Sequence, residues 1–253
     1  MQAGESRLDG QSWTLQPAPC TLYPAFMGFF LTFEGLDGSG KSTQLRKLAE
    51  HLQSQGLAIT VTRQPGGTHL GDRVRGLILD SKTEHLDPRT ELGLMFSDRA
   101  QCIAEVIAPA LHGGNVVLCD RFTDSTEAYQ GGGRQLGSEI VLRMHETMCG
   151  GLQPDLTLLL LADFDKSLAR ARRRNNRTAA AGQDEGRFER EDADFYRRVY
   201  DKYREVAGRE PNRVVIIDGD RSIETVHREI SDLVESKLRT AGVLPALPGA
   251  GVR

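Results

Sequence analysis

The sequence lacks any apolar run close to the roughly 20 residues that a membrane-spanning helix needs. It has only four cysteines, and these show neither CxxC spacing nor a partnered histidine cluster. We expect them to be reduced and structural, as in a cytoplasmic protein. The net charge is −3, so the chain has no excess of positive charge that would indicate binding to nucleic acid or to a membrane surface.

The two ends of the chain differ in composition from the segment between them. Residues 1–26 contain no basic stretch followed by an apolar one, so they do not resemble a secretory signal. They are either a disordered extension or the result of an upstream start, with Met27 as the natural first residue. Residues 240–253 are small, Pro- and Gly-rich and almost uncharged, which is typical of a flexible tail.

Between these ends, short apolar runs alternate with longer amphipathic stretches. The runs are continuous, as expected of strands buried on both faces: Phe29–Glu34, Ala58–Thr62, Val116–Cys119, Leu156–Leu161 and Arg213–Ile217. Helical patterns cover Lys41–Ser54, Asp72–Asp80, Pro88–Leu111, Glu139–Cys149, Asp165–Arg174, Glu189–Ala207 and Ile223–Leu238. The alternation predicts one α/β domain over residues 27–239, with a central five-stranded parallel sheet and helices on both faces.

A glycine-rich loop follows the first predicted strand. Residues 35–43, GLDGSGKST, fit G-x-x-x-x-G-K-[ST] between a strand and a helix. Backbone N–H groups and the helix N-terminus can surround phosphate oxygens, with Lys41 on the β- and γ-phosphates and Ser42 on Mg²⁺. The residues expected to bind ATP are Gly35, Leu36, Asp37, Gly38, Ser39, Gly40, Lys41, Ser42 and Thr43. The motif predicts a three-layer P-loop NTPase fold, which switches, motors and kinases share.

Polar residues follow two further strands, at the sheet edge where open α/β folds bind ligands. Asp120 ends the third strand and is placed to assist the metal, while the adjacent Arg121 suits a phosphate. Arg63 follows the second strand before a Pro-Gly-Gly turn, and Arg75 adds a cation on the next helix. Each cation taken alone also fits a solvated position. The polar stretch 120–134, DRFTDSTEAYQGGGR, is the main candidate for binding a phosphoryl acceptor.

Six segments, in order, resemble the bacterial thymidylate kinase (dTMP kinase) family of P-loop nucleoside monophosphate kinases: FFLTFEGLDGSGKST, TRQPGGT, LMFSDRAQ, DRFTDSTEAYQGGGR, PDLTLLL and GRFEREDADFYRRV. The resemblance covers residues 29–238 and implies phosphorylation of dTMP to dTDP with ATP and Mg²⁺, a step of dTTP biosynthesis. It also implies a homodimer, formed through the helices around Pro88–Leu111 and Glu139–Cys149. Two alternatives stay open: a kinase for another nucleotide or deoxynucleoside, and a nucleotide-dependent switch or binding module.

The resemblance implies roles for individual residues. Asp37 corresponds to an acid near Mg²⁺ and the deoxyribose. Arg63, Arg99 and Arg121 match basic residues that grip the dTMP phosphate or flank the base. Tyr129 matches a residue that closes over the sugar, where an aromatic ring disfavours a 2′-hydroxyl.

Base recognition is the part of the resemblance with the most departures. Thr126 and Gln130 match positions that read the polar edge of thymine, because a hydroxyl and an amide can donate and accept. The family's stacking aromatic lies four residues before the SDR arginine, where this chain has Met95, followed by Phe96. Phe96 is predicted to stack on the base, with Met95 as the alternative. Gln64 replaces a common Glu and would place an amide near the sugar. The predicted dTMP-binding residues are Asp37, Arg63, Arg75, Phe96, Arg99, Arg121, Thr126, Tyr129 and Gln130.

An arginine-rich lid is predicted over about residues 172–190, longer than the resemblance leads us to expect. Family members carry an assisting arginine either in the phosphate loop or in the lid, and this loop has none. Arg187 aligns best with the lid position, and Arg174 and Arg177 are alternatives. Since an acceptor phosphate is already anionic, transfer requires positioning and charge stabilisation rather than a strong base. The predicted catalytic residues are Lys41, Asp37, Arg121 and Arg187, with Ser42 and Asp120 on the metal.

Overall fold

A parallel sheet forms the centre of the protein, as seen in a computed structural model that describes residues 27–83, 86–167, 169, 186–188 and 191–245. Its five strands lie in the order β2-β3-β1-β4-β5. Their bounds are β1 (Phe29–Glu34), β2 (Ile59–Arg63), β3 (Val116–Asp120), β4 (Leu156–Leu161) and β5 (Val214–Asp218). β1 and β4 have the predicted bounds, and the other three differ by one residue at one or both ends. The predicted fold class, a P-loop NTPase with a parallel sheet, is confirmed.

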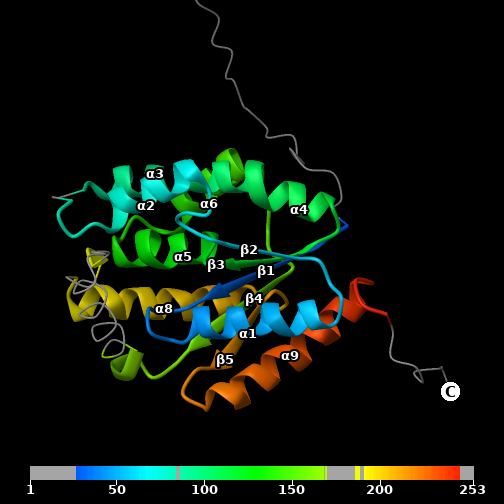
Figure 1. Cartoon of the computed structure of the whole chain (residues 1–253). Helices are drawn as coiled ribbons and strands as arrows, with labels where there is room; N and C mark the ends of the chain where they lie inside the picture. Colours follow the sequence, from blue (N-terminus) through cyan, green and yellow to red (C-terminus); the bar gives the residue numbers. More distant parts are fainter. Residues whose placement is uncertain (1–26, 84–85, 168, 170–185, 189–190, 246–253) are drawn as a thin grey trace, which may run out of the picture.

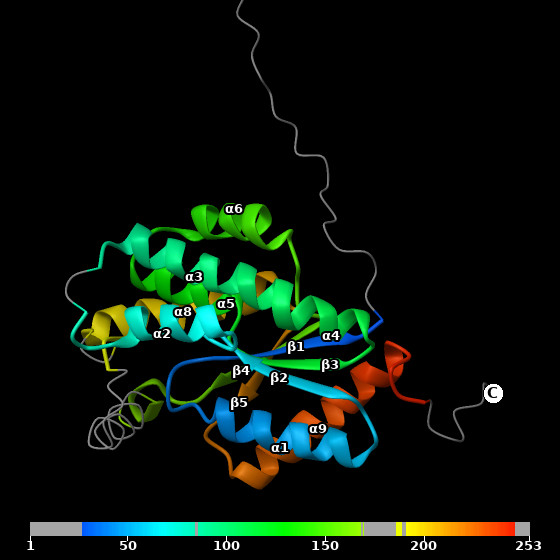
Figure 2. The ribbon, with the colours of Figure 1, turned by 45° about the horizontal axis from the view of Figure 1, so that its top comes forward.

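Helices cover both faces of the sheet (Figures 1 and 2). One face packs against α1 (Lys41–Ser54) and α9 (Ile223–Thr240). The opposite face packs against α2 (His69–Leu79), α3 (Pro88–Cys102), α6 (Ser138–Cys149) and α8 (Ala193–Arg209). Alternate residues of β1 serve the two faces: Leu31 lies in the α1–α9 core and Phe30 in the α3 core. Among the described residues, none of the helices is long and apolar enough to cross a bilayer.

The long helix predicted over Pro88–Leu111 is interrupted. α3 ends at Cys102, a π-helical segment η1 (Ile103–Ile107) follows, and α4 (Ala108–His112) completes the stretch. Pro109 explains the break, because it has no N–H to donate to the residue one turn earlier and its ring would clash with that carbonyl. Widening the preceding turn relieves this conflict.

The stretch after β3 is helical through its three glycines. α5 (Thr123–Thr126) leads into a π-helical segment η2 (Glu127–Gly133), and most of its residues are buried. A Cβ on Gly132 would lie 2.8 Å from the Cβ of Lys202, and one on Gly133 would lie 2.6 Å from the Phe195 ring. The glycines are therefore needed for η2 to approach α8.

Two helices begin at residues other than those predicted, because capping residues set their first turns. α2 begins at His69 because the Thr68 side chain accepts a hydrogen bond from the N–H of Gly71. α8 begins at Ala193 because Asp192 accepts one from the N–H of Phe195. The helix predicted over Asp165–Arg174 lies largely outside the described residues, as do Cys20 and most of the predicted lid. The other three cysteines are buried and free.

Candidate active site

The phosphate loop connects β1 to α1 at the carboxyl edge of the sheet. Gly35 has a φ of 130°, and a Cβ there would lie 2.2 Å from the carbonyl oxygen of Leu160, so only glycine fits. Lys41 opens α1, and its buried Nζ donates to the carbonyl oxygens of Gly35 (2.9 Å) and Leu36 (2.8 Å). Burial, together with the nearby Arg121 guanidinium, lowers the pKa of Lys41 to about 8. The ammonium is thus held inside the loop, where phosphate oxygens could replace the carbonyls.

Two oxygen-bearing side chains meet beside this loop. The hydroxyl of Ser42, in the first turn of α1, donates to Oδ2 of Asp120 over 2.9 Å. The sheet register pairs Asp120 with Phe33, so the end of β3 lies next to the start of the loop. A hydroxyl and a carboxylate are the hard ligands that Mg²⁺ prefers, and Mg²⁺ usually takes few protein ligands beside water and phosphate oxygens. This pair fits Mg²⁺, although no group of three or more His, Cys, Asp or Glu in the described residues could form a full protein cage.

Arg121 links the phosphate loop to the segment after β3. Its φ of 71° is a left-handed conformation that non-glycine residues adopt at a cost. Nη2 donates to Oδ1 of Asp37 (2.9 Å), and Nη1 donates to the hydroxyls of Ser125 (2.9 Å) and Tyr203 (3.1 Å). The guanidinium lies over the Tyr129 ring, 5.1 Å from its centroid. The Arg121 guanidinium therefore points toward the phosphate loop, and its hydrogen bonds and the Tyr129 ring fix its orientation.

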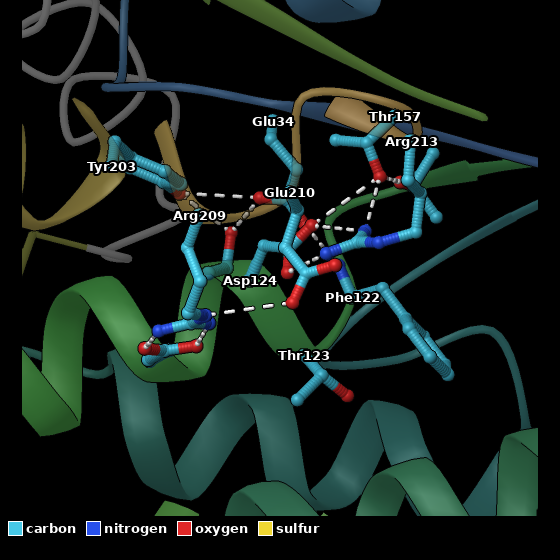
Figure 3. A network of polar contacts seen from close by, with 12 residues as sticks. Glu34, Phe122, Thr123, Asp124, Thr157, Tyr203, Arg209, Glu210 and Arg213 are labelled. Atoms are coloured by element: carbon cyan, nitrogen blue, oxygen red, sulfur yellow. Dashed lines mark hydrogen bonds and ion pairs between the residues drawn. The ribbon is translucent and has the colours of Figure 1, made fainter. Parts of the chain in front are cut away.

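A buried polar network surrounds Glu34 and Asp124 (Figure 3). Glu34, the last residue of β1, accepts hydrogen bonds from the N–H of Phe122 (2.7 Å) and the hydroxyl of Tyr203 (3.2 Å). Burial and the neighbouring Asp124 carboxylate raise the pKa of Glu34 to about 7. Asp124 is paired with Arg213 through bonds of 2.7 and 3.0 Å. The network joins the end of β1, α5 and the start of β5 into one support for the site.

Arg99 is almost fully buried beside the stretch after β3 that is predicted to bind the phosphoryl acceptor; we call this region the acceptor half of the site. Its Nε donates to Oε1 of Gln64 (2.7 Å) and its Nη2 to Oγ1 of Thr126 (2.8 Å). The guanidinium contacts the rings of Phe96 and Phe122, 5.0 and 5.2 Å from their centroids. Nη1 has no hydrogen-bond partner among the described residues. The amide of Gln64, expected near the sugar, holds Arg99 instead.

Gln130 follows Thr126 by four residues, and its side chain is fully buried. Its Nε2 donates to Oε1 of Glu91 over 2.7 Å. The other amide atom, Oε1, is buried without a partner in the described part of the chain. The site thus presents an unused donor on Arg99 and an unused acceptor on Gln130.

Met95 and Phe96 lie on different sides of α3. Glu91, Met95 and Arg99 are spaced four residues apart and share the face toward η2. Met95 belongs to the same apolar cluster as Tyr129, whereas Phe96 is fully buried in the core cluster around Phe30 and Phe122. The geometry therefore favours Met95 over Phe96 as the side chain beside a bound base.

The remaining predicted cations are engaged by groups of the protein itself. Arg63 is exposed and forms an ion pair with Asp72 at 3.3 Å, while Arg75 donates to the carbonyl oxygen of Pro65 (3.0 Å). Arg187 donates to Oε2 of Glu91 and to the carbonyl oxygen of Ile78, so it faces α2 and α3 rather than the phosphate loop. Its role as the assisting arginine stays a prediction. The other lid arginines lie outside the described residues.

Two functional candidates were missed in the sequence. Glu91 has no motif of its own; an acidic residue amid an apolar helix pattern was the available signal. The second is a cavity of about 370 Å³ between the phosphate loop and the turn after β5, lined in part by Thr43, Gly219, Arg221 and Ile223. A polar turn at the carboxyl end of β5 was the signal there, because ligands gather at that edge of the sheet.

The chain is similar to proteins of one known family. A family model described as thymidylate kinase matches residues 33–230. The chain belongs to the thymidylate kinase family. It is 46% identical to the thymidylate kinase of Pelobacter propionicus over 204 residues, which cover 81% of this chain and 92% of that protein. It is 48% identical to that of Desulfovibrio desulfuricans over 213 residues, 84% of this chain and 98% of the relative.

A solved relative supports both the family and the fold. The crystal structure of thymidylate kinase from Ehrlichia chaffeensis matches with a TM-score of 0.65 and 31% identity, over 82% of this chain and 98% of that one. The family resemblance seen in the sequence motifs is confirmed. Membership in this family makes the chain an ATP-dependent phosphotransferase of the nucleoside monophosphate kinase type, rather than a P-loop switch.

Proposed function

We propose that this protein transfers the γ-phosphoryl group of ATP to dTMP and so supplies dTDP for dTTP synthesis. The observation that carries the choice of base is the pair of unused buried atoms, Arg99 Nη1 and Gln130 Oε1. Thymine presents a carbonyl oxygen, O4, beside the N3–H group, which complements a donor beside an acceptor. Cytosine presents the reverse pattern and would leave both buried groups unpaired, at a cost in binding.

The phosphates meet between the phosphate loop and Arg121. Lys41 and the loop N–H groups hold the ATP phosphates, and Arg121, fixed by Asp37, holds the dTMP phosphate. An anionic phosphate oxygen then attacks without a general base, so positioning and charge neutralisation supply the catalysis. Ser42 and Asp120 would hold Mg²⁺, which would supply positive charge to offset that of the phosphates.

The two nucleosides have separate places. The cavity between the phosphate loop and the turn after β5 has room for the nucleoside of ATP. On the acceptor side, the hydroxyl of Tyr129 lies 3.4 Å from the Arg121 guanidinium and 3.5 Å from Asp37. These contacts support the proposal that the Tyr129 ring closes over the acceptor sugar and excludes a 2′-hydroxyl.

A coupled ADP-release assay over dTMP, dUMP, dCMP, dGMP, dAMP and UMP tests the proposal. We expect dTMP to give the highest kcat/KM and UMP to be poorly used. Turnover of another monophosphate with dTMP inert would refute the choice of substrate. Gln130→Ala should lower kcat/KM for dTMP by about tenfold or more while the KM for ATP changes little.

We also propose that the protein is a cytoplasmic homodimer. The exposed apolar side chains of Leu142 and Met148 on α6, beside α3, support an interface on these helices. Light scattering coupled to gel filtration measures the mass directly. A monomer at micromolar concentration would contradict the dimer.

A further inference from the structure

Glu91 lies at the centre of the acceptor half of the site, yet no part of the proposed reaction uses it. It is fully buried on α3 and accepts from three side chains. Gln130 Nε2 and Arg134 Nε donate to Oε1 (2.7 and 3.2 Å), while Nη2 of Arg134 (3.2 Å) and Nη2 of Arg187 donate to Oε2. Burial of a carboxylate is costly unless it is paired and hydrogen-bonded. We therefore asked what the partners of Glu91 do in the site.

The partners of Glu91 determine which way the Gln130 amide points. Arg134 and Arg187 have only donors, so both oxygens of Glu91 act as acceptors toward them. The Gln130 side chain can satisfy Oε1 of Glu91 only by turning its NH₂ group toward it. Its carbonyl oxygen must then face away from Glu91, and this is the buried atom left without a partner. The positions of the amide oxygen and nitrogen of a glutamine are often ambiguous. Here they are fixed, because a carboxylate can only accept hydrogen bonds and must face the NH₂ group.

We propose that Glu91 is a positioning residue that locks the Gln130 amide with its carbonyl oxygen toward the acceptor base. The pocket then selects bases with an N–H beside a carbonyl, such as thymine and uracil, over bases with a ring acceptor beside an amino group. This inference rests on the proposed function, since it concerns a thymine-bearing substrate. Glu91 touches no substrate and acts only through Gln130.

The ion pairs around Glu91 extend this lock to the segment before α8. Arg134 also pairs with Glu191 at 2.7 Å, and its guanidinium lies over the Phe195 ring at 4.8 Å. Arg187 lies over the Phe188 ring at 4.7 Å. These contacts hold two arginines against the carboxylate, so that both Glu91 oxygens act as acceptors and Glu91 can bind Gln130 only through the NH₂ group of the amide.

The test replaces Glu91 by glutamine, which has the same shape but can offer Gln130 either a carbonyl or an NH₂ group. Binding of dTMP, dUMP and dCMP is measured by titration calorimetry, and ATP binding serves as a reference. We expect Glu91→Gln to reduce the preference for dTMP over dCMP by about tenfold, with dUMP following dTMP and ATP affinity unchanged. Glu191→Gln, which breaks an ion pair of Arg134 without touching Gln130, should leave the preference intact.

Equal weakening of all three monophosphates, or an unchanged preference, would overturn the proposal and leave Glu91 a purely structural role. Should Glu91→Gln fail to fold, the double variant Glu91→Gln/Arg134→Gln, which removes one charge of each sign, carries the same comparison. Failure of the proposed function would appear separately, as absent turnover of dTMP by the unmodified protein. The preference for binding dTMP over dCMP can be measured whether or not the protein turns dTMP over.

Discussion

Lys41 is a buried cation whose pKa lies close to the working pH. Burial, the largest cause, and Arg121 lower it to about 8, while Asp37, Asp120 and Glu34 act in the opposite direction. Since phosphate binding favours the charged ammonium, ATP affinity should fall as pH rises through 8, by up to about tenfold per pH unit. Calorimetric titration with a non-hydrolysable ATP analogue from neutral pH upward measures this slope.

The comparison protein is Lys41→Met, which should bind the analogue more weakly and with little pH dependence over the same range. The same analogue is used with both proteins, so its own ionisation cancels in the comparison. An equal slope in both proteins would mean that another group, and not Lys41, titrates.

Glu34 should make the stability of the protein depend on pH. Burial and Asp124 raise its pKa from 4.5 to about 7. Between these values the folded state keeps a proton that the unfolded chain has released, so the contribution of this group to stability falls as pH rises from 4.5 through 7. Glu34→Gln stays neutral at every pH, so the variant should not show this loss of stability, which is on the order of 3 kcal/mol for the parent protein.

Urea unfolding of both proteins, once in mildly acidic and once in mildly alkaline buffer, tests this role. The unfolding free energy of Glu34→Gln should increase relative to that of the parent protein as pH rises. Parallel pH profiles would assign the dependence to another ionisable group.

At the scale of elements, the contact between η2 and α8 depends on the absence of side chains. Gly133→Ala would place a Cβ 2.6 Å from the Phe195 ring, in a region where η2 also carries Tyr129 and Gln130. We expect a loss of about 1–3 kcal/mol in unfolding free energy and weaker dTMP binding, because η2 must move away from α8. Denaturant unfolding and calorimetry measure the two effects.

Gly208→Ala on α8 is the matched control, because a Cβ there meets no atom within 4 Å. This change should be neutral or stabilise by up to about 1 kcal/mol through helix propensity. Equal effects of the two substitutions would show that Gly133 is not a packing requirement.

At the scale of the whole molecule, the Asp124–Arg213 pair joins the helical layer to the edge of the sheet. Arg213 precedes β5 and donates both to Asp124 on α5 and to Thr157 on β4. Arg213→Met should lower the unfolding free energy by about 3 kcal/mol, since it leaves a buried carboxylate unpaired. Thermal and urea unfolding provide the measurement.

An exposed pair on α6 provides the control for this change. Arg143 and Glu139 are each more than three-quarters exposed, so Arg143→Met should change stability by no more than about 0.5 kcal/mol. Similar losses in both variants would contradict a supporting role for the buried pair.

Local patterns were enough to predict much of the fold. Continuous apolar runs identified all five strands, and the loop motif located Lys41 and Ser42 at the start of α1. Helix ends were predicted less well, because Thr68 and Asp192 cap helices at positions that hydrophobic spacing does not mark. The break at Pro109 depends on a local clash whose relief, a wider turn, periodicity alone does not specify.

The sequence by itself determined the fold class, the phosphate loop and the family, because these depend on short-range spacing and on residues adjacent in the chain. Tertiary structure alone decided that Met95 and not Phe96 faces η2, that Gln64 holds Arg99, and that Arg187 lies against Glu91. The direction of the Gln130 amide belongs to the same group. These features arise from contacts between residues that are far apart in the chain, and no local pattern encodes which donor will meet which acceptor.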